Sequence, residues 1–153
     1  MIYYEDLEVG SVKEFGSYEV TLEEVMEFAR RYDPQPFHLD DEAAAATHFG
    51  RLSASGWHTC AMTMRMLVDS MTEVQQAGLG SPGVDKLRWV KPVYPGDMLR
   101  VRTEVVEKRR SRSKRWLGLF KSQVQTFNQN NEVVLDMISN GLIKVRDPEA
   151  ATE

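Results

Sequence analysis

The stretch that decides the fold is Trp57–Met71, with the sequence WHTCAMTMRMLVDSM. Its apolar residues Met62, Met66 and Leu67 recur at helical spacing, which predicts one long amphipathic helix. The chain after it contains four long stretches rich in Val, Leu, Trp and Phe, separated by segments of turn-forming residues. These four stretches are Val84–Val93, Met98–Lys108, Trp116–Asn128 and Val133–Val145. A helical front half followed by antiparallel strands predicts an α+β fold in which the long helix covers one face of the sheet.

The part of the chain before this helix predicts one strand and two further helices. Val12–Val20 alternates like a short strand, and Leu22–Tyr32 has the apolar spacing of an amphipathic helix. Thr21–Glu24 matches a capping box, which would open that helix. The alanine-rich segment Asp40–His48 predicts a second, short helix, capped by one of the two aspartates that begin it.

The six residues after the first predicted helix, Asp33-Pro34-Gln35-Pro36-Phe37-His38, join a carboxylate to an imidazole across two prolines. A proline directly after Asp33 disfavours continuation of the helix, and the fixed φ of both prolines restricts the turn that follows. Asp33 and His38 are therefore expected in a preset relation, suited to holding and deprotonating a water molecule. Taken alone, the segment also suits an ordinary turn, because Asp-Pro is a frequent turn former.

Composition indicates one ordinary globular domain. The chain has 153 residues, 42% hydrophobic and 27% charged, which disfavours disordered and fibrous classes. A net charge of -4 argues against a general nucleic-acid binder. The expected organisation is a domain over residues 1–146 and a disordered tail over residues 147–153.

The expected location is the cytoplasm. The first residues show no basic region followed by an apolar stretch, and no apolar run approaches about 18 residues, so neither a signal peptide nor a membrane span is predicted. The one cysteine, Cys60, excludes an intrachain disulfide and fits a reducing compartment. Its place within the long helix predicts a buried, inert thiol.

A metal site is not predicted. His38, His48 and His58 lie ten residues apart, which is neither the spacing of a helical ligand pair nor that of a Cys-x-x-Cys clasp. His48 and His58 are expected at the surface or at helix ends. No Gly-x-Ser-x-Gly pattern or phosphate-binding glycine loop is present, so no acyl-enzyme chemistry and no cofactor is predicted.

A basic cluster interrupts the otherwise acidic chain. It comprises Lys108, Arg109, Arg110, Arg112, Lys114 and Arg115. One interpretation is a solvated hairpin end whose charges discourage edge-to-edge pairing. The other is a contact with phosphate groups, which arginine and lysine pair well.

Four segments of the chain together resemble the MaoC-type dehydratases, the family of the (R)-specific enoyl-CoA hydratases. Phe28–Asp40 is similar to the hydratase motif, an aspartate followed five residues later by a histidine with proline between. Ser53–Trp57 stands in the place of the His-Gly before the central helix, and Leu87–Asp97 resembles the strand and Pro-Gly-Asp turn. Arg110–Ser113 with Asn128–Val134 resembles the later strands. The resemblance implies a single hot-dog domain, an antiparallel sheet wrapped around a long central helix.

By this resemblance Asp33 and His38 are the catalytic residues, and the backbone N–H of Gly56 helps to form the oxyanion hole. The chain departs from the family pattern twice. Ser55 stands where histidine usually precedes the glycine, and a serine found eight positions after the glycine is Met64 here, with Thr63 as the nearest hydroxyl. These departures leave the substrate open.

The implied activity is reversible hydration of the 2,3-double bond of an enoyl thioester, giving a 3-hydroxyacyl thioester. The residues expected to bind substrate are Ser55, Trp57, Thr63, Met64, Arg109, Arg110 and Arg112. The basic cluster suits the phosphates of acyl-CoA, although an acyl carrier protein would suit it too. A homodimer or higher homo-oligomer is expected, because the last strands are long and apolar.

Two alternatives stay open. The first is a hot-dog acyl-CoA thioesterase, although hydrolases of this fold normally place an acidic residue in or beside the central helix, and Asp69 lies late in it. The second is a non-catalytic protein that binds acyl thioesters, for which Ser55 and Met64 are the motivating departures.

Overall fold

The computed structural model describes residues 1–150, which form five strands, three α-helices and two 3₁₀ turns. In chain order these are η1 (Tyr4–Asp6), β1 (Val12–Glu19), α1 (Leu22–Tyr32), η2 (Pro36–His38), α2 (Asp41–Ala45), α3 (Gly56–Ser70), β2 (Gly83–Trp89), β3 (Met98–Arg110), β4 (Leu117–Phe127) and β5 (Val133–Lys144). Every predicted strand and helix is present, with ends that differ from the predicted ones by a few residues.

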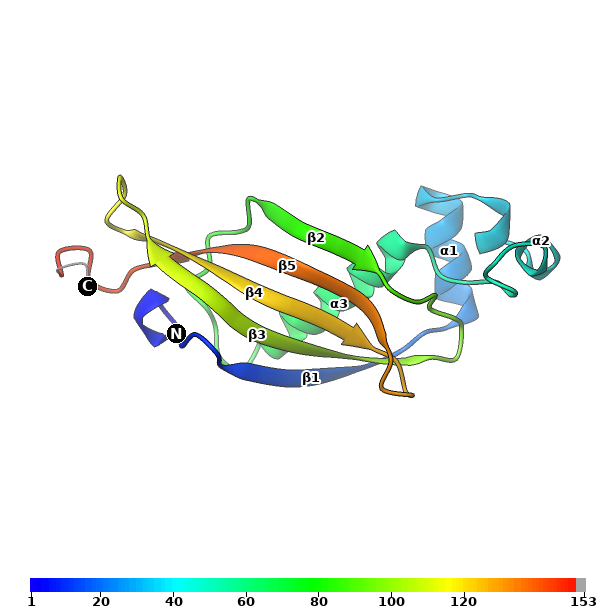
Figure 1. Cartoon of the computed structure of the whole chain (residues 1–153), viewed down its shortest axis with the longest axis horizontal. Coiled ribbons are helices and arrows are strands. Elements are labelled where there is room, and N and C mark those ends of the chain that lie inside the picture. Colours follow the sequence, from blue (N-terminus) through cyan, green and yellow to red (C-terminus); the bar gives the residue numbers. More distant parts are fainter. Residues whose placement is uncertain (151–153) are drawn as a thin grey trace.

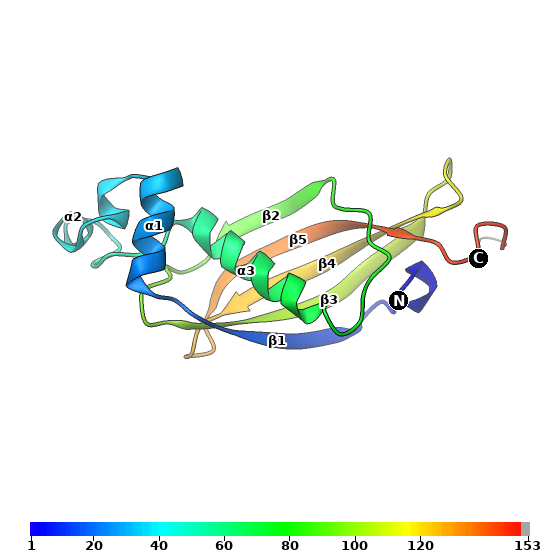
Figure 2. The same cartoon turned by 180° about the vertical axis from the view of Figure 1, so that it is seen from behind.

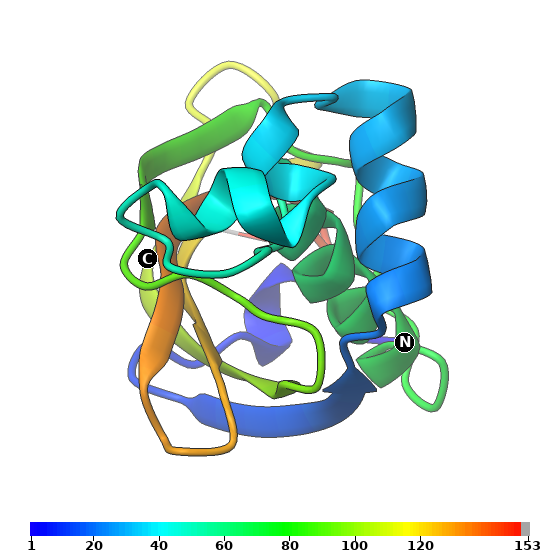
Figure 3. The ribbon, with the colours of Figure 1, turned by 90° about the vertical axis from the view of Figure 1, so that its right-hand side faces the viewer.

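The five strands form one sheet in the order β1-β3-β4-β5-β2, and all neighbouring strands are antiparallel. The sheet curves around α3, which lies along its concave face (Figures 1 and 2). This confirms the predicted α+β fold and the hot-dog arrangement. The helices α1 and α2 sit together at one end of the sheet, beside the start of α3 (Figure 3).

The core lies between α3 and the concave face of the sheet. From the helix Met62 and Met66 are at most 4% exposed, and they belong to one cluster with Val101, Val124 and Val134 of the central strands. Burying each such side chain contributes about 1.5–3 kcal/mol, so this layer holds the helix on the sheet. The methionines of α3 that face the sheet are therefore core residues.

The observed helix caps agree in part with those that the sequence predicts. Thr21 Oγ1 accepts a hydrogen bond of 3.2 Å from the backbone N–H of Glu24, so the predicted cap of α1 forms. The return half of the predicted capping box is absent among the described contacts, because the Glu24 carboxylate turns instead to Tyr18 and His58. The short helix α2 is capped by Asp40, whose Oδ1 accepts from the Glu42 N–H at 3.1 Å.

The edge strands of the sheet are β1 and β2, whereas β4 and β5 lie inside it. Neighbouring strands already pair with both edges of β4 and β5, so a partner in the expected homodimer would meet an edge strand or a face of the sheet. On the edge strand β2, Val84 and Trp89 are about half exposed at 47% and 45%.

The Pro-Gly-Asp segment between β2 and β3 forms the predicted turn. Gly96 has φ +95° between β2 and β3, a backbone conformation that favours glycine, and the Asp97 carboxylate accepts a 2.9 Å hydrogen bond from Tyr94 N–H. The expected tail is described only over residues 147–150, and residues 151–153 lie outside the described part. Within residues 1–150, no helix is both long and apolar enough to cross a membrane.

Candidate active site

Asp33 and His38 face each other at the end of the molecule that carries α1. Asp33 ends α1, where its N–H still donates to Ala29 O at 2.9 Å, and His38 ends the short turn η2. His38 Nε2 lies 3.4 Å from Asp33 Oδ2, and both side chains are largely buried, at 6% and 17% exposure. The two prolines thus produce the juxtaposition that the sequence predicts.

The Asp33 carboxylate is held by two further donors. Gln35 Nε2 donates to its Oδ1 at 2.6 Å, and the Ser55 hydroxyl donates to its Oδ2 at 2.7 Å. Burial raises the pKa of Asp33, but the hydrogen bonds from Gln35 and Ser55 and the nearby His38 ring lower it, with the net result below the usual value. Asp33 is therefore a carboxylate at neutral pH and can only accept hydrogen bonds.

The orientation of His38 follows from its other nitrogen. Nδ1 lies 2.7 Å from the backbone carbonyl oxygen of Ser53. A carbonyl oxygen can only accept, so Nδ1 carries the proton and Nε2 of the neutral ring has a free lone pair. That lone pair faces Asp33 Oδ2. Asp33 Oδ2 and His38 Nε2 are thus two hydrogen-bond acceptors side by side, and further hydrogen bonds hold each side chain in place. This arrangement suits a molecule that donates two hydrogen bonds, as water does.

The start of α3 lies beside this pair. Ser55 precedes the helix but makes no side-chain cap to it, and its hydroxyl points at Asp33 and donates to that carboxylate. Gly56 is the first residue of α3, and the first four N–H groups of a helix have no acceptor within that helix. The positive end of the helix dipole adds to these free donors, so the Gly56 N–H suits an anionic oxygen. The carbonyl of Gly56 accepts a 2.8 Å hydrogen bond from the indole of Trp89.

The other helix residues predicted to bind substrate differ in their surroundings. They are Trp57, Thr63 and Met64. Thr63 is fully buried and hydrogen-bonds Thr126 on β4 at 2.7 Å, so its hydroxyl faces the sheet. Trp57 and Met64 are exposed at 59% and 53% on the outer side of α3. They are accessible to a ligand, whereas Thr63 is not.

The predicted arginines do not meet Asp33 within one chain. They lie at or beyond the end of β3, at the opposite end of the sheet from α1 and α2 (Figure 1). Arg110 donates to the carbonyls of Pro148, Ala150 and Arg115, at 3.2, 2.9 and 3.0 Å. Arg109 and Arg112 are exposed. Arg110 therefore ties the chain end to the β3–β4 hairpin, while Arg109 and Arg112 remain available.

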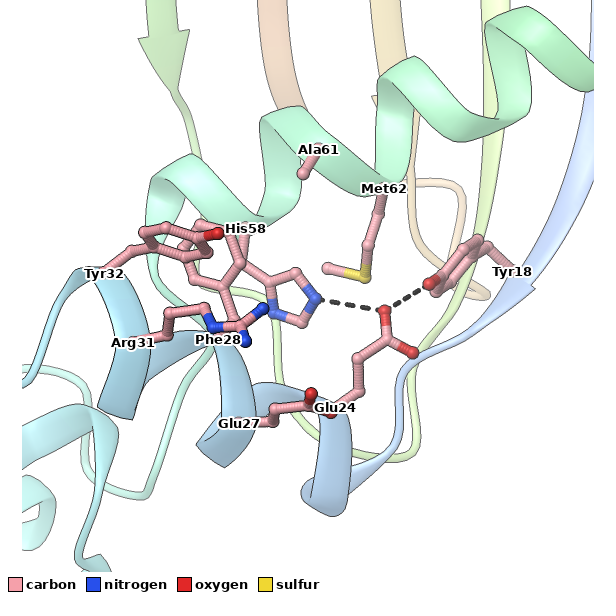
Figure 4. A pocket seen from close by; sticks show the side chains of 9 residues that line it. All are labelled: Tyr18, Glu24, Glu27, Phe28, Arg31, Tyr32, His58, Ala61 and Met62. Atoms are coloured by element: carbon pink, nitrogen blue, oxygen red, sulfur yellow. Dashed lines mark hydrogen bonds and ion pairs between the residues drawn. The ribbon is translucent and has the colours of Figure 1, made fainter.

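A second polar cluster, Tyr18–Glu24–His58, lies on another side of α3 and borders a cavity of about 250 Å³ (Figure 4). Glu24 Oε1 accepts from the Tyr18 hydroxyl and faces His58 Nε2 at 3.2 Å. The prediction that His58 lies at the surface or at a helix end was wrong in its first part. The side chain is 2% exposed and stacks on Phe28 with ring centroids 4.8 Å apart. The cluster fixes α1 against α3, the helices that position Asp33 and Gly56.

Burial sets the ionisation of this cluster. It lowers the pKa of His58, against the opposing effect of Glu24, so the imidazole is neutral at physiological pH. Burial, together with the hydrogen bond to Glu24, raises the pKa of Tyr18 to about 12. His48, in contrast, is exposed, as predicted.

Three residues of the site were missed by sequence reasoning: Gln35, Ser53 and Trp89. Gln35 lies inside the proline motif, only two residues after Asp33 in the chain, so the sequence could have indicated a local hydrogen bond between them. Ser53 contributes a backbone carbonyl, which no residue type signals. Trp89 lies 33 residues from Gly56 along the chain, and only the tertiary structure brings them together.

The remaining candidate groups do not extend the site. Within residues 1–150, no three His, Cys, Asp or Glu side chains come close enough to hold a metal ion. Asp69 forms an i,i+4 ion pair with Arg65 at 3.0 Å in the last turn of α3, and both side chains are exposed. Cys60 is partly exposed, and burial raises the pKa of its thiol, which disfavours the reactive thiolate.

The chain is similar in sequence to a known protein family. The family model described as the MaoC like domain matches residues 8–125, more than half of the chain. The chain belongs to the MaoC-like domain family. The matched range of this MaoC-like domain includes Asp33, His38, Ser55, Gly56 and Trp89.

Similar proteins support a hydratase or dehydratase activity for this chain. This MaoC-like domain is 32% identical to a 3-hydroxybutyryl-CoA dehydratase of Methylorubrum extorquens, over 99% of this chain and 88% of that protein. A crystal structure of a MaoC-like dehydratase from Rhodospirillum rubrum is 39% identical, with a TM-score of 0.89 and coverage of 96% of this chain and 99% of that one. The (R)-hydratase PhaJ1 of Pseudomonas aeruginosa is 25% identical, with a TM-score of 0.67 and coverage of 99% and 95%.

Proposed function

We propose that this MaoC-like domain hydrates the 2,3-double bond of an enoyl thioester, and in reverse dehydrates a 3-hydroxyacyl thioester. One observation carries the proposal. Asp33 Oδ2 and the free lone pair of His38 Nε2 lie 3.4 Å apart as paired acceptors, next to the free N–H groups that begin α3.

In the hydration direction, a water molecule donates one hydrogen bond to Asp33 and one to His38. His38 Nε2 takes a proton as the water oxygen bonds to C3 of the enoyl group, and the π electrons move onto the thioester oxygen. The resulting enolate oxygen accepts a hydrogen bond from the Gly56 N–H, at the positive end of α3. The proton then passes from the pair to C2, which restores the carbonyl and the neutral imidazole. Dehydration follows the same steps in reverse.

The relatives support the substrate class. The 3-hydroxybutyryl-CoA dehydratase of M. extorquens is named for a short 3-hydroxyacyl-CoA, and the P. aeruginosa protein is named an (R)-hydratase. We extend this class to the present chain as acyl-CoA, with an acyl carrier protein as the second possible carrier. Exposed Trp57 and Met64 border the start and middle of α3, where an acyl or pantetheine group would pass.

The test is spectroscopic. Purified protein is given straight-chain and branched enoyl-CoA thioesters of short, medium and long chain, and loss of the enoyl-thioester absorbance is followed. We expect turnover with at least one substrate, and a kcat reduced at least ~100-fold in Asp33→Asn and in His38→Gln. His48→Gln replaces an exposed histidine and serves as the matched control. Release of free thiol without hydration would show a thioesterase, and binding without any product would show a non-catalytic protein.

We also propose that the chain forms a homodimer in which a second copy covers the edge strand β2. This edge is unpaired, and Val84, Trp89 and Val90 on or beside it are 47%, 45% and 52% exposed. Analytical ultracentrifugation of the wild type should give a dimer or a higher assembly. Val84→Lys should weaken it, whereas Val12→Lys on the other edge strand should not.

A further inference from the structure

We infer that Trp89 is a positioning residue, which holds Gly56, the first residue of α3, so that the Gly56 N–H points at the substrate oxygen. This inference rests on the proposed hydratase reaction. It assigns a task to a residue on another element, the end of the edge strand β2.

The indole of Trp89 contacts Gly56 in two ways. Its Nε1–H donates to the Gly56 carbonyl oxygen at 2.8 Å. Its ring also covers the Cα of Gly56, because a Cβ added there would lie 2.5 Å from Cε2, 2.7 Å from Cδ2 and 2.8 Å from Nε1 of the ring. Real Cβ atoms do not approach other atoms this closely. A side chain at position 56 would therefore require the indole of Trp89 to move.

The start of α3 needs such an anchor because its ordinary cap is missing. A serine before a helix normally accepts a hydrogen bond from one of the first free N–H groups, and losing such a cap costs about 1 kcal/mol. Ser55 makes no such bond, and its hydroxyl points instead at Asp33, to which it donates. Trp89 supplies the restraint from outside the helix. Trp89 also packs edge to face against Trp57, the residue after Gly56, with ring centroids 5.0 Å apart.

An irregularity in β2 directs the indole of Trp89 toward the start of α3. The pairing of β2 with β5 shifts register between Asp85 and Arg88, and Lys86 within this irregularity has φ +53°. Side chains alternate between the two faces of a strand, so an irregularity of this kind changes the face on which the following residues lie. Trp89 then reaches the helix start, although it remains 45% exposed.

A displaced oxyanion donor weakens the transition state more than it weakens substrate binding, and removing one donor commonly lowers kcat ~100-fold or more. Trp89→Phe keeps a ring but loses the N–H, and we expect kcat to fall about 10-fold. Trp89→Ala loses both contacts, and we expect a fall of about 100-fold. KM should change less than about 3-fold in each variant. Trp116→Phe, at another exposed tryptophan, is the control and should keep the wild-type kcat.

A double-mutant cycle separates packing from substrate approach. Gly56→Ala is made in the wild type and in Trp89→Ala, and circular dichroism and thermal unfolding confirm that each variant folds. If Trp89 imposes the glycine, Gly56→Ala should cost much less in the Trp89→Ala background. An equal cost in both backgrounds would mean that the glycine serves substrate approach alone, and the inference would be overturned.

One measurement does not depend on turnover. The NMR order parameter of the Gly56 N–H, which reports how rigidly the peptide is held, should be lower in Trp89→Phe and Trp89→Ala than in the wild type and Trp116→Phe. An active wild type whose Trp89 variants keep both kcat and this order parameter would refute the inference and leave the hydratase standing. An inactive wild type would refute the hydratase, and the order parameters would still decide whether Trp89 holds Gly56.

Discussion

The hydroxyl of Ser55 donates a 2.7 Å hydrogen bond to Oδ2 of Asp33, 22 residues earlier in the chain. Ser55 is 1% exposed, and its own peptide bond carries the Gly56 N–H. One residue thus links the carboxylate proposed to hold the water to the donor proposed for the substrate oxygen. The serine in place of the family's usual histidine is therefore compatible with chemistry at this site.

Ser55→Ala should lower kcat/KM about 10- to 100-fold, because a hydrogen bond to a charged group contributes about 1.5–3 kcal/mol. Ser55→Thr keeps a hydroxyl and should retain more activity than Ser55→Ala. Enoyl-thioester kinetics give the comparison. Ser70→Ala, at the far end of α3, is the matched control, and an equal loss in that variant would point to helix stability instead.

The same substitution should change the pH profile. The Ser55 hydrogen bond is one of the effects that lower the pKa of Asp33. Without it that pKa rises, so the carboxylate takes up a proton at a higher pH as the solution is acidified. The acid limb of kcat/KM should therefore move to higher pH in Ser55→Ala. An acid limb that stays in place would show that Asp33 does not control it.

His58 should make the fold sensitive to mild acid. Burial holds the pKa of His58 below its ordinary value of 6.5, so below that pH the unfolded chain binds a proton that the folded chain does not. Stability should thus be complete above pH 6.5 and decrease as the pH falls toward the lowered pKa. His58→Gln cannot titrate, so its melting temperature should depend less on pH over this range. Thermal unfolding at several pH values gives the test, and equal slopes would contradict it.

Thr63 is expected to matter for stability and not for substrate binding. Thr63→Val leaves the buried Thr126 hydroxyl without its partner and should cost about 1–3 kcal/mol in the free energy of unfolding, with KM unchanged. Removing both hydroxyls in Thr63→Val with Thr126→Val should recover part of that loss. A large rise in KM with normal stability would restore Thr63 as a substrate contact.

The arginines of the hairpin should separate into two roles. Arg110→Ala should lower the melting temperature, because it removes contacts to Pro148, Ala150 and Arg115. Replacing exposed Arg109 and Arg112 together by alanine should leave stability unchanged and raise the KM for an acyl-CoA at low salt, where surface charges are least screened. An unchanged KM at low salt would remove these two residues from the substrate site.

Local pattern determined much of this protein. The apolar spacing of Leu22–Tyr32 predicted α1, and the prolines after it predicted the pairing of Asp33 with His38, because all of these effects act within a few residues. Stretches rich in Val, Leu, Trp and Phe between turn-forming segments predicted the four later strands for the same reason. The sequence by itself therefore determined the elements, the fold class and the two residues at the centre of the site.

The tertiary structure alone decided which distant groups support Asp33, His38 and the start of α3. Nothing local distinguishes a serine that caps α3 from one that holds Asp33, or an edge-strand tryptophan from one that packs on Gly56. The burial of His58 likewise depends on Phe28 and Glu24 of another helix. Such contacts join residues far apart in sequence, and they form only because the sheet, wrapping around α3, brings the ends of α1 and β2 to the start of that helix.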